Sequence, residues 1–256
     1  MKRQFLIIPD ARRIEESAAL AEKYGAAFEY NDFCDPAVYE DKDAVRRLCS
    51  LYQGLGRRRT QDTLHGAFLD VTVTSRDSVI RSRSRYLAEQ SLAIAQELGV
   101  KGVVFHSGLI AGLQTEDYLQ GWLLASEHFW GKMAQKYPDV TIYMENTFEQ
   151  TPDMLLALKM RLSENHNFKL CFDYGHACLT STPIEHWAVM FSKDTGHIHL
   201  NDNDGRADLH QVPGEGKLDF EKCKELLEVY FPQKPVLLEL RGIKEQERAL
   251  AYMDAI

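Results

Sequence analysis

RSRYLAEQSLAIAQELGVKGVVFHSG, residues 83–108, joins a helix pattern to a strand pattern. In residues 83–99 the apolar residues recur at helical spacing up to Gly99, and glycine commonly follows the last turn of a helix. Residues 102–106 are a short apolar and β-branched run that ends at a histidine. The stretch therefore predicts a helix followed by a buried strand.

The same alternation of strand and helix patterns occurs eight times along the chain. Further helix patterns occupy residues 13–25 and 152–165. The strand patterns are QFLIIP (4–9), AAFEY (26–30), DTLHGAF (62–68), GVVFHSG (102–108), VTIYMEN (140–146), KLCFDYGH (169–176), GHIHLND (196–202) and PVLLELRG (235–242). No linker rich in proline or serine separates them. The sequence therefore predicts an α/β fold, a (β/α)8 TIM barrel formed by a single domain over residues 1–256.

The composition narrows the class of protein. Thirty Lys and Arg residues against 38 Asp and Glu residues give a formal net charge of −8, which disfavours a dedicated nucleic-acid-binding protein. Five cysteines form no CxxC pair, so we expect reduced thiols rather than disulfides. The first residues, MKRQFLIIPDARR, contain too short an apolar run for a signal peptide or a membrane-spanning helix. We therefore expect a cytoplasmic protein without a membrane partner.

Histidines and carboxylates stand at the ends of six consecutive strand patterns. In a TIM barrel the active site is formed at the C-terminal ends of the strands and in the loops that follow. These positions hold His65, His106, Glu145, Asp173, His176, His199 and Glu239, and the loop after the seventh strand adds Asp208 and His210. Because imidazole and carboxylate groups are metal ligands, the sequence predicts a metal site at the mouth of the barrel.

Some of these positions also allow a structural role. A lone histidine at a strand end is more often hydrogen-bonded or exposed than bound to a metal ion. Glu145 and Glu239 follow apolar residues, where an unpaired carboxylate costs several kcal/mol and therefore needs a cation or a proton. His197 alternates with His199 and points to the same side, one layer deeper. We expect His197 to be packed and hydrogen-bonded.

Several motifs resemble those of a known superfamily in their order and spacing. They are ENTF (145–148), FDYGH (172–176), HIHLND (197–202), DLH (208–210) followed by PGEGKLDF (213–220), and LLELRG (237–242). They are similar to the xylose-isomerase-like TIM-barrel superfamily, which contains sugar and sugar phosphate isomerases and epimerases and endonuclease IV. The resemblance runs from the third strand pattern to the C-terminus, and the first sixty residues add little.

The resemblance implies two ligand sets. Members that act on sugars hold one divalent ion, and the matching ligands here are Glu145, Asp173, His199 and Glu239, with His176 beside the substrate. Endonuclease IV holds three zinc ions, and the additional positions here are His65, His106, His176, Asp208 and His210. The D-x-H motif also occurs in members grouped with the sugar isomerases, so both activities stay open. We expect Zn²⁺, Mn²⁺ or Co²⁺, one ion at least and up to three, because the set lacks thiolates.

The function predicted first is that of a metal-dependent isomerase or epimerase of a small sugar or sugar derivative. Glu145 and Glu239 would transfer a proton through an enediolate, one removing it and the other returning it. The alternative is a multi-zinc phosphodiesterase like endonuclease IV, acting on abasic DNA. A metal-containing binding module is a third hypothesis, which is disfavoured because neither glutamate is missing.

The candidate substrate contacts are Arg206, His210 and Arg241. Ketose epimerases tend to carry an arginine three residues before the P-G of the loop after the seventh strand, where this chain has His210, and this departure puts ketose 3-epimerase activity in doubt. Arg206 in the same loop and Arg241 after Glu239 are the substitutes.

Basic residues suited to DNA are few. The run Arg57–Arg59 precedes the third strand, on the side of the barrel away from the site, and we expect it to be solvated. Arg81 and Arg85 share one face of the next helix, where a surface role is favoured. We therefore expect a small-molecule carbohydrate substrate rather than nucleic acid. A homo-oligomer stays open, because no apolar stripe identifies an interface.

Overall fold

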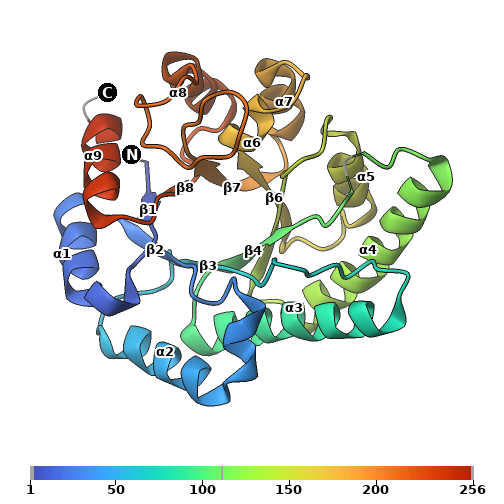
Figure 1. The fold of residues 1–256 in the computed structure, drawn as a ribbon, viewed down its shortest axis with the longest axis horizontal. Helices are drawn as coiled ribbons and strands as arrows, with labels where there is room; N and C mark the ends of the chain where they lie inside the picture. The colour runs from blue at the N-terminus through green and yellow to red at the C-terminus, as the bar shows by residue number, and fades with distance from the viewer. Residues whose placement is uncertain (1–2, 111, 255–256) are drawn as a thin grey trace. The chain divides into compact units, whose positions relative to one another are not determined.

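Eight strands form a closed parallel barrel in the computed structural model, which describes residues 3–110 and 112–254 (Figure 1). The strands follow one another around the barrel in chain order. They are β1 (Phe5–Ile7), β2 (Ala27–Tyr30), β3 (Thr63–His65), β4 (Gly102–His106), β5 (Thr141–Glu145), β6 (Phe168–Asp173), β7 (Thr195–Leu200) and β8 (Val236–Leu238). The predicted (β/α)8 barrel is confirmed. The proposed boundaries of the domain, residues 1–256, stay a prediction.

Helices follow the strands, as the repeated units predict. They are α1 (Ile14–Tyr24), α2 (Lys42–Gly54), α3 (Ser78–Leu98), α4 (Glu116–Lys136), α5 (Asp153–Arg161), α6 (Tyr174–Cys178), α7 (Ile184–Phe191), α8 (Phe220–Tyr230) and α9 (Ile243–Asp254), with short 3₁₀ helices at Ala11–Arg13 and Pro36–Glu40. Helices α1 and α3 end where the sequence predicts, because Gly25 and Gly99 adopt φ values of +66° and +68° and cap the last turn.

The chain divides into two compact units. Unit 1 consists of Met1–Glu29, Asn146–Pro152 and Leu170–Ile256, and unit 2 consists of Tyr30–Glu145 and Asp153–Lys169. In unit 1, β1 pairs with β2 and β8, β7 pairs with β6 and β8, and α1 lies beside α9 (Figure 1). In unit 2, β4 pairs with β3 and β5, and α2 lies beside α3.

The strands are shorter than the apolar runs that predict them. The run 4–9 contains a strand of three residues, and the run 235–242 contains another. All residues of β2, β3, β7 and β8 are buried, as expected for parallel strands covered on both faces. The residues that follow each strand begin the loops, and Glu239 accordingly lies one residue beyond β8.

Each unit has aromatic side chains in its core. In unit 1, Phe172 stacks on Phe231 with ring centroids 5.0 Å apart. In unit 2, Phe105 packs against Trp130 at 4.8 Å. The five cysteines are free, as predicted, and Cys171 is fully buried. No helix in the described part of the chain is long and apolar enough to cross a membrane.

Candidate metal centre

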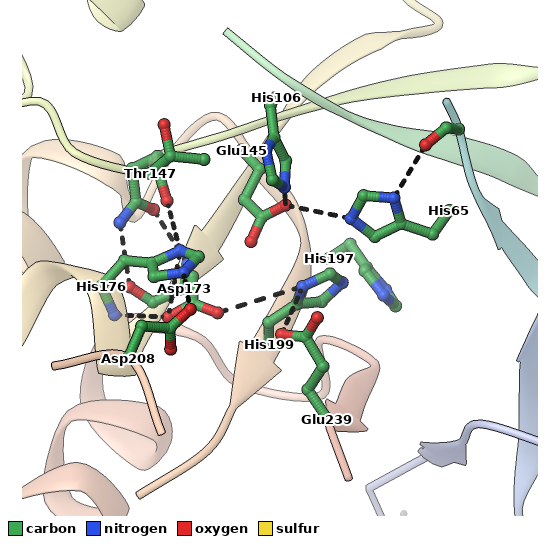
Figure 2. Close-up of polar contacts among 12 residues, drawn as sticks. His65, His106, Glu145, Thr147, Asp173, His176, His197, His199, Asp208 and Glu239 are labelled. Carbon is green, nitrogen blue, oxygen red and sulfur yellow. Dashed lines mark hydrogen bonds and ion pairs between the residues drawn. The ribbon is translucent and has the colours of Figure 1, made fainter. Parts of the chain in front are cut away.

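In unit 2, the strand ends bring His65, His106 and Glu145 together. The Nε2 atoms of His65 and His106 lie 3.6 and 3.4 Å from Oε2 of Glu145, and Figure 2 shows both rings directed at this carboxylate. Nδ1 of His65 lies 3.0 Å from the carbonyl oxygen of Gly66. Because a carbonyl oxygen only accepts, Nδ1 carries the proton and Nε2 presents its lone pair to the carboxylate.

The spacing of these three side chains suits a metal ion. Two ligand atoms about 2.1 Å from one ion, at a tetrahedral angle, lie about 3.4 Å apart. A direct hydrogen bond from a charged N–H to a carboxylate is shorter, about 2.7–2.9 Å. The distances of 3.4 and 3.6 Å, together with a mixed imidazole and carboxylate donor set, therefore fit a divalent ion such as Zn²⁺.

Phe68, in the loop after β3, packs against both histidine rings of this group. Its ring centroid lies 5.3 Å from that of His65 and 4.4 Å from that of His106. The contact restricts the orientation of the two imidazoles and covers part of their surface.

In unit 1, Asp173, His199 and Glu239 converge from β6, β7 and the end of β8. Nδ1 of His199 lies 3.3 Å from Oε2 of Glu239 and 4.0 Å from Oδ2 of Asp173 (Figure 2). Asp173 and His199 are fully buried, and Glu239 is 8% exposed. Each residue offers one ligand atom within 4.8 Å of the others. This spacing again suits a shared cation.

A further group in unit 1 consists of His176, Asp208 and His210. Oδ2 of Asp208 lies 3.2 Å from Nε2 of His176 and 3.0 Å from Nε2 of His210. Nδ1 of His176 lies 3.0 Å from the carbonyl oxygen of Asn146, and Nδ1 of His210 lies 3.0 Å from that of Glu239. Both Nδ1 atoms therefore donate, and both Nε2 atoms face one carboxylate, which requires a proton or a metal ion between them.

The pKa shifts in the His176, Asp208 and His210 group also favour a positive charge beside the carboxylate. Burial lowers the pKa of His210, but the hydrogen bond with Asp208 and the charge of Glu239 outweigh it and raise the pKa to about 9. Burial raises the pKa of Asp208, but hydrogen bonds from His176 and His210 hold it well below its usual range. A positive charge at this position is thus strongly favoured.

Asp202 organises the loop that carries Asp208 and His210. Its carboxylate accepts four backbone N–H bonds of 2.8–3.0 Å, three of them from the PGEGKL segment. A Cβ at Gly216 would lie 2.3 Å from Oδ1 of Asp202, so only glycine fits there. His210 has a φ of +49°, a left-handed conformation that the loop imposes. The sequence-based expectations missed this role of Asp202, for which the glycines of PGEGKL were the available signal.

Glu29 of β2 is a second residue that those expectations missed. It is fully buried, with Oε2 2.9 Å from Nε2 of His197 and Oε1 3.2 Å from Nε2 of His199. Burial raises the pKa of Glu29, but His199 and His197 lower it well below its usual range. The carboxylate lies behind the His199 ring, whose Nδ1 faces Asp173. His197 is buried and hydrogen-bonded, as predicted.

Within unit 1, Asn146 is hydrogen-bonded to the end of β6. Its side-chain Nδ2 donates to the carbonyl oxygen of Asp173, and its Oδ1 accepts the Asp173 N–H, both at 2.9 Å. Asp173 also caps α6, because its Oδ1 accepts the N–H of His176 at 2.6 Å.

The predicted arginine contacts lie outside these groups. The Arg206 and Arg241 side chains are exposed and stay predictions as substrate contacts. The prediction of a solvated run at residues 57–59 is wrong for two members. Arg57 is paired with the buried Asp62 at 3.0 Å, and Nε of Arg59 donates to the carbonyl oxygen of Leu98 at 2.8 Å. Both are therefore structural.

Known proteins share both sequence and fold with this chain. A family model described as a xylose isomerase-like TIM barrel matches residues 18–256. A probable endonuclease 4 of Mycobacterium leprae is 28% identical over 172 residues, which cover 62% of this chain and 65% of that protein. The chain therefore spans slightly less than two thirds of this relative.

Two solved structures share the fold. A Thermus thermophilus protein, from a crystal soaked with ZnCl2, has a TM-score of 0.78 and 26% identity, covering 99% of this chain and 97% of that one. A D-tagatose 3-epimerase-like protein has a TM-score of 0.77 and 20% identity, covering 98% and 96%. At 20% identity, the second likeness shows the fold alone.

Proposed function

The chain belongs to the xylose isomerase-like TIM-barrel family, and from this premise we propose that it hydrolyses a phosphate ester at a centre of up to three divalent metal ions. The observation that carries the proposal is the His176, Asp208 and His210 group, in which two Nε2 atoms face one carboxylate. A hydrolase that holds both the attacking and the leaving oxygen with metal ions would use this group as a further metal site, whereas a single-metal isomerase would use it only beside the substrate.

We assign the ligands in three sets. They are His65, His106 and Glu145 in unit 2, and, in unit 1, Asp173, His199 and Glu239 together with His176, Asp208 and His210. Each set lies within one unit, and its members offer ligand atoms within 4.8 Å of one another.

The residues of the chain orient and protect these ligands. When bound, the ions would supply a hydroxide from water near neutral pH and would stabilise negative charge on the phosphate oxygens. Glu29 holds the His199 ring, and Asp202 holds the loop that carries the third set. Phe68 covers the two histidines of the first set. The ligand atoms are therefore preorganised by contacts behind them.

One relative supports hydrolysis of a phosphate ester, and another supports a zinc site. The curated relative at 28% identity is described as a probable endonuclease, and the solved structure at 26% identity comes from a crystal soaked with zinc chloride. The epimerase-like structure contributes the fold alone. The isomerase or epimerase activity stays a prediction from the sequence.

Metal content and activity test the proposal together. We expect protein purified without chelator to contain two or three zinc ions per chain, to hydrolyse bis(p-nitrophenyl) phosphate, and to lose this activity with a chelator and regain it with Zn²⁺. Incision of a duplex with one abasic site tests the DNA substrate separately. A single ion per chain, no phosphoester hydrolysis and solvent-deuterium exchange into a ketose would replace the proposal with the isomerase.

A further inference from the structure

Unit 2 contains a cavity of about 840 Å³ that the proposed metal centre does not use. Its walls come from the loop after β3, the start of α3, the loop after β4 and the first half of α4. All these segments lie at the C-terminal ends of their strands, on the side of the barrel where active sites form. The cavity is therefore well placed to hold a part of the substrate.

Three arginines, Arg76, Arg81 and Arg85, line this cavity. Nη1 of Arg81 donates to the carbonyl oxygens of Ser75 and Arg76, at 2.7 and 2.9 Å, and Nε of Arg85 donates to that of Val73 at 3.0 Å. These bonds hold two guanidinium groups in place through neutral acceptors. Each guanidinium carries five N–H donors, so most of its hydrogen-bonding capacity is available to a ligand.

The positive charge of these arginines is not balanced locally. Among the described residues, none of the three guanidinium groups has a carboxylate within 4.0 Å. Arg81 and Arg85 are one turn apart on α3, and burial together with repulsion from Arg81 lowers the pKa of Arg85. Arg83, on another face of the same helix, is by contrast paired with Glu40. In a chain with a net charge of −8, such a cluster indicates an anion site.

Beside the arginines and the hydroxyl groups of Thr72, Thr74, Ser75 and Thr115, the wall of the cavity has an apolar and aromatic part. Ile80, Ile110 and Leu113 line it and are 49%, 59% and 39% exposed. The rings of Tyr118 and Trp122 complete it. A cavity with guanidinium groups and an exposed apolar wall suits a ligand that has both an anionic and an apolar part.

The cavity is connected to the first ligand set. Nε1 of Trp122 donates to the carbonyl oxygen of Ser107 at 3.2 Å, and Ser107 directly follows His106. The loop after β3 carries Phe68, which packs on His106, and continues to Thr72 and Arg76 in the cavity wall. The walls of the cavity are therefore formed by the segments that directly follow His65 and His106.

We propose that this cavity binds a non-reacting anionic group of the substrate, a phosphate or carboxylate joined to an aromatic or other apolar moiety. The inference rests on the proposed function for the reacting phosphate ester, and it narrows the substrate to small organic phosphate esters of this kind. Guanidinium groups bind such anions through paired N–H donors, and the aromatic side chains accept the flat apolar part.

Binding of phenyl phosphate tests the inference. In metal-loaded protein we expect saturable binding by calorimetry and a change in tryptophan fluorescence that Trp122→Phe abolishes, because Trp122 lines the cavity and Trp130 and Trp187 do not. The Arg81→Gln/Arg85→Gln double variant should weaken the binding that Trp122 reports at least about tenfold. Arg83→Gln, on the same helix, is the matched control and should leave it unchanged.

Two further measurements separate this inference from the proposed function. The Arg76 side chain is exposed, so Arg76→Glu reverses a charge without removing the carbonyl bonds that the Arg81 and Arg85 side chains make, and it should also weaken binding. The fluorescence signal should persist after the metal ions are removed, whether or not the protein hydrolyses phosphate esters. Binding without a Trp122 signal, or unchanged affinity in Arg76→Glu and in the double variant, would overturn the inference even in an active hydrolase.

Discussion

His199 has two ring nitrogens in different surroundings, and its role depends on which of them carries the proton. Nε2 lies 3.2 Å from the Glu29 carboxylate, while Nδ1 faces Glu239 and Asp173. A carboxylate behind a histidine holds the proton on the nitrogen that it contacts and leaves the other nitrogen for a metal ion. Glu29 of β2 would thereby prepare Nδ1 of His199, on β7, to bind a metal ion.

Glu29→Gln tests this role at the scale of one residue. The amide is a weaker acceptor and removes the negative charge, so we expect zinc affinity to fall about 10- to 100-fold while the fold is kept. Competition with a chromophoric chelator measures the affinity. Glu164→Gln, at an exposed position, is the control. Equal zinc affinity in the two variants would show that Glu29 does not support the metal centre.

At the scale of elements, the proposed number of ions depends on the loop after β7, which carries Asp208 and His210. Asp208→Asn should remove one ion per chain and lower phosphoester hydrolysis about 10²-fold or more. The reason is that an uncharged amide cannot balance the positive charge of an ion held between the two imidazoles. Elemental mass spectrometry and turnover of bis(p-nitrophenyl) phosphate measure the two effects. Full activity with one ion fewer would mean that this loop is dispensable and would favour a single-metal enzyme.

The same loop depends on Gly216. In Gly216→Ala the new Cβ would lie 2.3 Å from Oδ1 of Asp202 and 2.6 Å from the carbonyl oxygen of Asn203, so the loop must shift and lose hydrogen bonds to a buried carboxylate. We expect a loss of about 1–3 kcal/mol in the free energy of unfolding, measured with urea. Gly54→Ala, where a Cβ meets nothing within 4 Å, should change it little.

At the scale of the whole molecule, bound ions and fold stability are linked. Asp173 and Glu239 are buried acids of unit 1 that a cation would stabilise. Ions at about 100 times their Kd add about 2.7 kcal/mol, or about 5–10 °C in Tm for a chain of this size. Calorimetry before and after chelation, with zinc added back, measures the shift. A Tm that does not change when the chelator is added would argue against bound ions in the native protein.

Most of the candidate ligand positions could be proposed from the sequence because each stands at the end of a strand pattern. His65 and His106 close short apolar runs, and the side chains at such ends face the mouth of a barrel. The tautomers of these histidines were not predictable, because each depends on the carbonyl oxygen that Nδ1 meets. Asp202 and Glu29 were missed because their partners are backbone amides and buried histidines from other segments.

The sequence by itself determined the barrel, the order of its strands and the chemical types at their ends, since these follow from local periodicity, glycine caps and residue type. Only the tertiary structure decided which residues outside the predicted ligand sets act with them. Glu29 stands behind His199 although β2 and β7 are far apart in the chain, and Arg76 meets Trp122 around one cavity. Contacts of this kind depend on how distant segments pack, and no local pattern encodes that packing.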